Sequence, residues 1–278
     1  MTKRIVIVIL WAVAVLSAAR AQDAPEPPET FSFEGGTLTI TRNEDYEKVL
    51  DFNGKELARN FDLSLDRMVE VSGVKVALFA VGDGGNMCPP ATVIVWKLEG
   101  SEEVETQAVG EDCGSPPPAV ASDAIYFVPY LLPGASDVVG SWSPSEGLLT
   151  VGSLTYAPEA GTSWTDLDPA KLYNIIDALR NEAVYRASMT LLGDKLTGVV
   201  TGLLVGGGTE STSSGAFYAS GCVPHNCGGS NTFMAVDPKA RKVYFAQQGD
   251  TPEPNAWPAA DTWPEELREA MHAAVGGG

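Results

Sequence analysis

The chain has 278 residues, of which 44% are hydrophobic and 19% charged, and its formal net charge is −18. A disordered chain would carry fewer apolar residues, and a nucleic-acid binder needs basic side chains to neutralise phosphate. The composition therefore predicts an ordered protein and excludes nucleic acid as a partner.

The first 21 residues have the pattern of a secretory signal peptide. Lys3 and Arg4 form a basic start, Ile5 to Leu16 are apolar, and residues 19–21 read Ala-Arg-Ala, a small-residue cleavage pattern. The apolar run is too short to span a bilayer. We therefore expect a mature chain that begins at Gln22, does not span a membrane, and is periplasmic or secreted.

Residues 22–165 are predicted to form a mostly β domain, because short β-branched and aromatic runs alternate there with Gly, Pro and Asn. The domain is acidic, which indicates either the solubility of an exported protein or attraction to a basic partner. Asn53-Gly54 predicts a tight type I′ turn, since both residues tolerate positive φ. Residues 157–163 are interpreted as a linker. The predicted strands are Thr37–Thr41, Lys48–Phe52, Phe61–Val71, Val74–Val81, Ala91–Lys97, Ala124–Tyr130 and Leu148–Thr155.

Residues 166–278 mix helical and strand periods, which predicts a smaller α+β domain with an antiparallel sheet and flanking helices. The Asp168-Pro169 pair predicts the start of a helix that ends near residue 183. Thr262 and Glu265 predict a capping box for a final helix. The predicted strands are Ala216–Ser220, Thr232–Val236 and Lys242–Ala246, and Gly206–Gly208 are interpreted as a flexible connection.

The four cysteines form an even number behind an export signal, which predicts disulfides rather than free thiols. Three pairings are conceivable. We favour Cys88–Cys113 and Cys222–Cys227, because each pair then stays within one predicted domain. The second bond would close a short ring in which Pro224 has a fixed φ and the flanking glycines permit a sharp reversal. The ring reads Cys222-Val223-Pro224-His225-Asn226-Cys227.

This ring lies in a stretch of 26 residues, Ser211–Val236, that has no Asp, Glu, Lys or Arg, and His225 is its one group that titrates near neutral pH. Three interpretations compete: a convex, pre-ordered interaction loop with His225 at the tip, a structural clip in which the histidine has no role, and a metal site with two thiolates and an imidazole. An oxidising compartment favours paired sulfurs, so we predict no metal and no cofactor. The interaction loop explains the lone imidazole, the lack of charge and the rigid frame together.

The motif Cys222-x-Pro224-His225-x-Cys227-Gly, followed by two strands across a turn, resembles the protruding loop of the inhibitor of vertebrate lysozyme family. The resemblance is close over residues 216–247 and extends more weakly over the surrounding helix and strand order. It implies that the ring enters the active-site cleft of c-type lysozymes, where its histidine contacts the two catalytic carboxylates.

Two ring positions depart from the family pattern. Val223 stands where the family usually has lysine, and Asn226 where it has aspartate. The lysine would contact an acidic cleft and the aspartate would orient the loop, so these replacements imply a different target or a different strength of inhibition. Residues 22–165 suggest no family.

The resemblance implies a non-enzymatic inhibitor of c-type lysozyme or a related muramidase, and members similar to the second domain can form homodimers. One alternative is a module that binds the cell envelope or a glycan through the first domain and inhibits nothing. A second is a glycoside hydrolase, which needs only two of the 36 acidic residues. A serine hydrolase is disfavoured, because the chain has only two histidines and no G-x-S-x-G motif.

Overall fold

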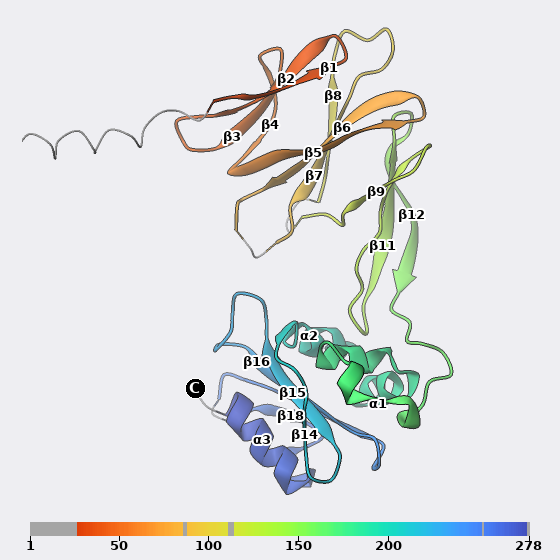
Figure 1. Ribbon diagram of the computed structural model, residues 1–278, viewed down its shortest axis with the longest axis vertical. Helices are drawn as coiled ribbons and strands as arrows, with labels where there is room; N and C mark the ends of the chain where they lie inside the picture. The colour runs from red at the N-terminus through yellow and green to blue at the C-terminus, as the bar shows by residue number, and fades with distance from the viewer. Residues whose placement is uncertain (1–26, 86–87, 111–113, 252, 277–278) are drawn as a thin grey trace, which may run out of the picture.

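The computed structural model describes residues 27–85, 88–110, 114–251 and 253–276. The predicted signal peptide and Cys113 lie outside these residues. Figure 1 shows an N-terminal part built from sheets and a C-terminal part in which helices accompany a sheet. The predicted fold classes of both parts are confirmed. Among the described residues, no helix is both long enough and apolar enough to cross a membrane.

Over the described residues, the N-terminal part consists of three four-stranded antiparallel sheets. The first contains β1 (Glu29–Phe33), β2 (Gly36–Arg42), β3 (Lys48–Phe52) and β4 (Lys55–Asn60) in that order. The second contains β5 (Asp62–Val71), β6 (Val74–Gly82), β7 (Ala91–Trp96) and β8 (Glu105–Val109). The third has the order β12-β11-β10-β9, with β9 (Pro118–Val120), β10 (Ile125–Phe127), β11 (Ser136–Ser143) and β12 (Gly147–Thr155).

The middle sheet is buried on both faces. Alternate residues of β6 point to opposite faces, so Phe79 packs into a cluster with the first sheet while Leu78 packs into another with the third sheet. In the second cluster the rings of Trp96 and Trp142 meet edge to face, with 4.9 Å between centroids. This double burial explains why β6 and β7 read as continuous apolar runs, which made them recognisable in the sequence.

The Asn53-Gly54 turn is confirmed, with φ of 51° and 84°. It joins β3 to β4, and β4 was not among the predicted strands. β4 has exposed or half-buried residues throughout, so it lacks the apolar alternation on which the prediction relied. The predicted strand Ala124–Tyr130 is shorter in the structure, where β10 spans only Ile125–Phe127.

The C-terminal sheet is antiparallel and has six strands, in the order β13-β15-β16-β17-β18, with β14 also pairing with β15. These strands are β13 (Val205–Gly206), β14 (Glu210–Ser211), β15 (Phe217–Cys222), β16 (Asn231–Asp237), β17 (Lys242–Gln247) and β18 (Asn255–Trp257). The α-helices are α1 (Glu182–Leu192), α2 (Leu196–Thr201) and α3 (Glu265–Val275). The 3-10 turns are η1 (Trp164–Asp166), η2 (Pro169–Lys171), η3 (Ile175–Arg180), η4 (Gly193–Lys195) and η5 (Ala260–Thr262).

Helices cover both faces of this sheet. On β16, Met234 faces the core shared with α1 and α2, whereas Phe233 faces the core shared with α3. The central strand β16 is therefore apolar on both faces and is packed between α1 and α2 on one side and α3 on the other. That framework positions the turn between β15 and β16, in which the predicted ring lies.

The helix predicted from residue 169 to about 183 is wrong. The segment forms the short turns η2 and η3, and the first α-helix begins only at Glu182. Asn174 accepts a hydrogen bond from the Ile176 amide, and Asn181 accepts from the amides of Ala183 and Val184. Each asparagine caps a new turn, so the continuous helical periodicity is divided into separate pieces.

The final helix is confirmed, but its predicted capping box is wrong. The residue before α3 is Pro264, which provides no side-chain cap. The Thr262 hydroxyl instead donates to the Ala259 carbonyl over 2.7 Å and closes the preceding turn. Residues 157–163, interpreted as a linker, are tied to the C-terminal part, because the Glu159 carboxylate pairs with Arg180 at 2.6 Å.

Candidate functional site

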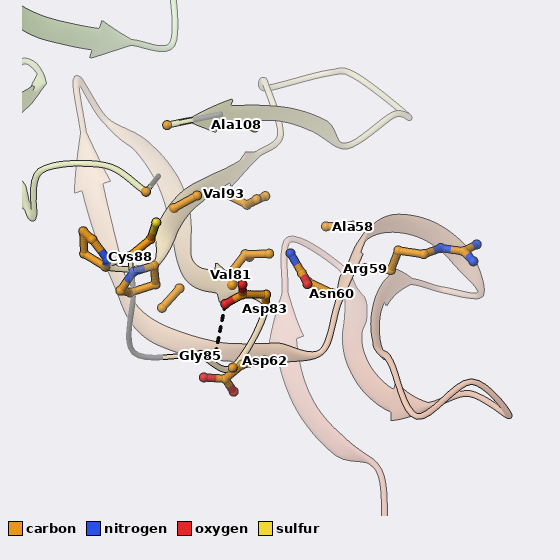
Figure 2. Close-up of a pocket in the computed structure, with 18 residues that line it drawn as sticks. Ala58, Arg59, Asn60, Asp62, Val81, Asp83, Gly85, Cys88, Val93 and Ala108 are labelled. Carbon is orange, nitrogen blue, oxygen red and sulfur yellow. Dashed lines mark hydrogen bonds between the residues drawn. The ribbon is translucent and has the colours of Figure 1, made fainter. Parts of the chain in front are cut away.

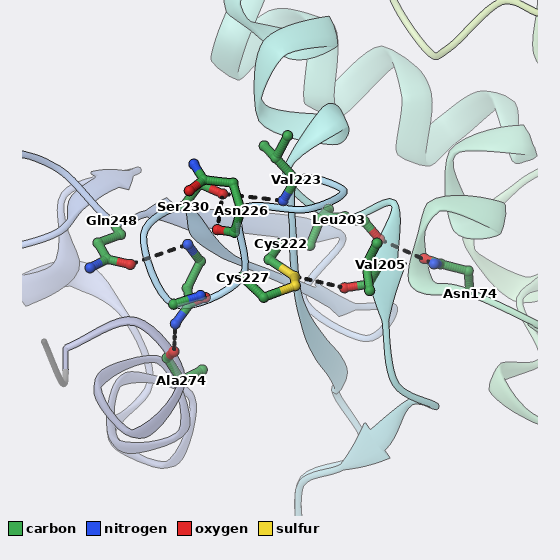
Figure 3. Close-up of a disulfide and its surroundings, with 12 residues drawn as sticks. Asn174, Leu203, Val205, Cys222, Val223, Asn226, Cys227, Ser230, Gln248 and Ala274 are labelled. Atoms are coloured by element: carbon green, nitrogen blue, oxygen red, sulfur yellow. Dashed lines mark hydrogen bonds between the residues drawn. A yellow bond between two sulfur atoms is a disulfide. The ribbon is translucent and has the colours of Figure 1, made fainter. Parts of the chain in front are cut away.

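The predicted ring is closed by a disulfide between Cys222, the last residue of β15, and Cys227. Their Cα atoms lie 5.0 Å apart, and Figure 3 shows the bond at the base of the loop. Cys222 is buried at the end of β15, between β13 and β16, while Cys227 is exposed. The ring is therefore anchored at Cys222 and open to solvent from His225 to Cys227.

Within the ring, residues 223–226 form a β-turn in which the Asn226 amide donates to the Val223 carbonyl over 3.0 Å. Proline fixes φ at the second position, and His225 at the third has a φ of 62°, which is the pattern of a type II turn. That third position normally belongs to glycine, because a side chain is strained there. His225 thus occupies an unfavourable backbone conformation that the ring imposes on it.

The exposed tip of the ring carries the imidazole. Val223 and Pro224 are half-buried, whereas His225 and Asn226 are exposed. The predicted ring residues are therefore brought together in one projecting turn, with the histidine facing solvent. The second histidine, His272, lies exposed on α3 and takes no part in the ring.

Ser230, which the sequence did not single out, links the first and last residues of the turn, Val223 and Asn226. Its hydroxyl donates to the Asn226 carbonyl over 2.9 Å and accepts from the Val223 amide over 3.3 Å. The ends of the turn are thus joined through one side chain. A serine a few residues after a turn is a general signal for such bonds, although it does not say which groups will be joined.

Asn231 connects the base of the loop to two other elements. Its side-chain oxygen accepts from the Gly228 amide over 3.0 Å, and its side-chain nitrogen donates to the Ala274 carbonyl on α3 over 3.4 Å. Its own amide donates to the side chain of Gln248 over 3.2 Å. Figure 3 shows Gln248 and Ala274 on one side of the ring and Val205 of β13 on the other.

The site offers little for metal binding. The sulfurs of Cys222 and Cys227 are bonded to each other and are not thiolates. Over the described ranges, no three His, Cys, Asp or Glu side chains gather as metal ligands would. The arrangement suits recognition of a partner by a stiff, uncharged projection that bears one imidazole. The other predicted bond, Cys88–Cys113, involves a residue outside the described ranges.

A separate concavity of about 710 Å³ lies in the N-terminal part, between the end of β4 and the segment that joins β6 to β7 (Figure 2). Its charged side chains already have partners. Arg59 is paired with Glu56 at 2.7 Å, and the Asp83 carboxylate accepts from the Gly85 amide over 2.9 Å. The cavity is large enough for a small ligand, and the charged side chains described along its wall are each hydrogen-bonded or paired within the chain.

Comparison with known proteins assigns a family description to each part. Residues 34–155 match the Y4bG N-terminal domain, and residues 183–277 match the inhibitor of vertebrate lysozyme (Ivy) family. The uncharacterized protein y4bG of Sinorhizobium fredii (strain NBRC 101917 / NGR234) is 24% identical over 242 residues, which cover 87% of this chain and 88% of that protein. No solved structure matches the chain. The chain therefore joins a Y4bG N-terminal domain, for which the sequence alone suggested no family, to a domain of the inhibitor of vertebrate lysozyme family.

Proposed function

We propose that the protein is an exported, non-enzymatic inhibitor of c-type lysozyme or a related muramidase, which acts by inserting the Cys222–Cys227 ring into the enzyme's cleft. One observation carries the proposal: a disulfide-closed turn projects His225 into solvent, in a domain that matches a family of lysozyme inhibitors. Residues 166–278 would form the inhibitory domain.

The chemistry of the target fits an imidazole. A retaining glycosidase holds a protonated carboxylic acid and a carboxylate about 5 Å apart, and an imidazole carries two nitrogens on opposite sides of its ring. Neutral His225 can accept from the acid and donate to the carboxylate, and the imidazolium can donate to both. Either form would occupy the place where the scissile bond must lie, so catalysis would stop by occlusion.

The other residues of the ring hold His225 in place. The disulfide, Pro224 and the Ser230 hydrogen bonds hold the turn in one conformation, so little conformational entropy is lost when it enters a cleft. Val223 and Asn226 lie on either side of Pro224 and His225 in the chain and would adjust the fit to the enzyme. A structural disulfide and the secretory pattern at the N-terminus both support a periplasmic or secreted location.

The direct test is an inhibition panel with the full mature chain against c-type, g-type and bacterial lytic muramidases, read as clearance of a peptidoglycan suspension. We expect inhibition of at least one enzyme at micromolar concentration, loss of that inhibition in His225→Ala, and no loss in His272→Ala. His272 is the matched control because it is exposed and lies outside the ring. A panel without any inhibited enzyme, or full potency in His225→Ala, would refute the proposal.

The cavity of about 710 Å³ favours a second candidate function, in which the N-terminal domain binds a glycan or another envelope component. Calorimetric titration of the full chain with soluble peptidoglycan fragments would test it. Binding that persists unchanged in His225→Ala, in a protein that inhibits no muramidase, would favour this function over the first. Absence of binding would leave the cavity without a role in glycan recognition.

A further inference from the structure

The ring has a neighbouring surface that the proposed function does not yet use. We name the segment Leu204–Gly208, together with the side chain of Tyr173, the glycine shelf. Its strand β13 pairs with the end of β15, so that Val205 lies opposite Cys222. The Val205 carbonyl oxygen lies 3.6 Å from the Cys222 sulfur, which makes the shelf continuous with the base of the ring (Figure 3).

The glycine shelf is concave on both sides of β13. A depression of about 350 Å³ lies between the shelf and the ring, and another of about 440 Å³ lies between the shelf and Tyr173. The two depressions share Val205, Gly206 and Gly207. Together they make one surface that leads from the disulfide to the aromatic ring of Tyr173.

Large apolar side chains on this surface face solvent. Tyr173 is 95% exposed, Val205 is 47% exposed and Leu204 is 39% exposed. Adjoining apolar groups of this kind mark surfaces that meet another molecule, and tyrosine is enriched where proteins bind one another. An isolated exposed apolar residue would need no explanation. These three all line the depression of about 440 Å³.

The surface is also free of charge, in a chain with a net charge of −18. The segment from Leu203 to Thr209 has no charged residue, and the ring lies in a stretch without any. Two nearby carboxylates are hydrogen-bonded within the chain: Asp177 accepts from the amides of Tyr173 and Asn174, and Glu210 accepts from the Tyr218 hydroxyl over 3.0 Å. An apolar, uncharged partner surface would therefore meet no charged side chain of the shelf itself.

We propose that the glycine shelf is a second contact surface for the muramidase and receives an uncharged, apolar part of the wall beside the cleft that the ring enters. This inference rests on the proposed function. When a projecting ring enters a cleft, the surfaces at its base come nearest to the cleft walls, and the shelf is the surface joined to the buried end of the disulfide. The shelf thus contributes to affinity and to the choice of target enzyme.

The glycines of the shelf make a sharp test feasible. A Cβ added at Gly207 would have no atom within 4 Å, so a side chain there leaves the fold intact and projects from the shelf. Gly152 in β12 is equally open and exposed, and it lies in the N-terminal part. Gly207→Glu and Gly152→Glu therefore add the same charge to the same chain, but only the first adds it to the shelf.

The experiment measures the inhibition constant of the full chain for the muramidase that responds best, alongside thermal unfolding and sedimentation. We expect Gly207→Glu to weaken inhibition about tenfold or more, because the added carboxylate must be desolvated against an apolar wall, while Gly152→Glu does not change it. Tyr173→Ala should also weaken inhibition about tenfold, whereas Tyr130→Ala, which removes another tyrosine that is 87% exposed, should not.

If Gly207→Glu and Tyr173→Ala inhibit as well as the wild type while His225→Ala is inactive, the shelf is not a contact surface. The proposal for the ring would then still hold. If Gly207→Glu instead dissociates a dimer of the chain without affecting inhibition, the shelf is a self-association surface and the inference fails. If the wild-type chain inhibits no enzyme, both proposals fail together.

Discussion

At His225 the backbone conformation favours glycine, whereas the proposed activity requires an imidazole side chain. Its φ of 62° belongs to the left-handed region, where glycine is free of strain and other residues are not. This chain has a histidine there although glycine would suit the turn better. This is the pattern expected when a side chain is needed at a position for its chemistry rather than for folding.

Replacing His225 by glycine should separate the two roles. We expect His225→Gly to be as stable as the wild type or up to about 1 kcal/mol more stable, since the strain is relieved while chain entropy offsets part of the gain. The same variant should lose inhibition. Urea denaturation and the clearance assay check both statements; a variant that is clearly destabilised would show that the histidine holds the ring together.

Ser230 should act as a positioning residue for the ring. Ser230→Ala removes the hydroxyl that links Val223 to Asn226, so we expect inhibition to weaken about fivefold to tenfold through a less ordered turn. Ser230→Thr keeps the hydroxyl and should restore potency. Ser136→Ala, which removes a hydroxyl bonded to Thr155 on the β11–β12 hairpin, is the control. Equal potency in Ser230→Ala and wild type would contradict this role.

At the residue scale, the sequence predicted the ring but not the side chains that support it. Two cysteines, a proline and a histidine within six positions define the ring by spacing alone. Ser230 bonds to Val223 and Asn226, and its position in the sequence does not say which groups it joins. Asn231 contacts Gln248 and Ala274, which are distant in the chain. The long-range contacts of Asn231 leave no local pattern, so they became visible only once α3 and the end of β17 were placed beside the loop.

At the scale of elements, the prediction succeeded where burial is periodic and failed where polar side chains interrupt it. β6 and β16 are apolar on both faces and were recognised. The segment before α1 kept a helical spacing of apolar residues, but Asn174 and Asn181 divide it into separate turns. Periodicity reports which residues face a core, and capping decides where the backbone changes direction.

The end of β12 is joined to α1 through Tyr156. Its hydroxyl donates to the Leu179 carbonyl over 3.0 Å, and its ring meets that of Tyr185 with centroids 5.2 Å apart. Burial raises the pKa of Tyr156 to about 12. The neutral phenol is therefore the form that the folded protein accommodates.

This pKa predicts how Tyr156→Phe will respond to alkali. A pKa raised by folding adds stability that is complete below pH 10, where the unfolded chain keeps its proton, and is lost as the pH rises towards 12. The phenylalanine variant lacks the hydrogen bond and should be about 1 kcal/mol less stable at pH 8. That difference should shrink between pH 10 and 11.5 in urea denaturation; a constant difference would contradict the assignment.

At the scale of the whole molecule, the two parts of the chain meet through specific contacts. Thr197 on α2 donates to the Pro133 carbonyl over 3.1 Å, a bond between residues 64 positions apart. Leu132 packs against the core of the C-terminal part, and the Glu159–Arg180 pair lies at the same junction. The junction could not be predicted, because the sequence of residues 157–163 resembles a free linker and the other contacts join remote segments.

The central claim is that the ring occupies the substrate cleft of a muramidase. The most direct measurement is the affinity of the full chain for an inhibited enzyme, recorded with the cleft empty and with the cleft saturated by a soluble oligosaccharide of the enzyme's own substrate. The account predicts competition, with the apparent affinity falling in proportion to cleft occupancy. Unchanged affinity for the saturated enzyme would contradict it, because the ring and the sugar cannot lie in one cleft at the same time.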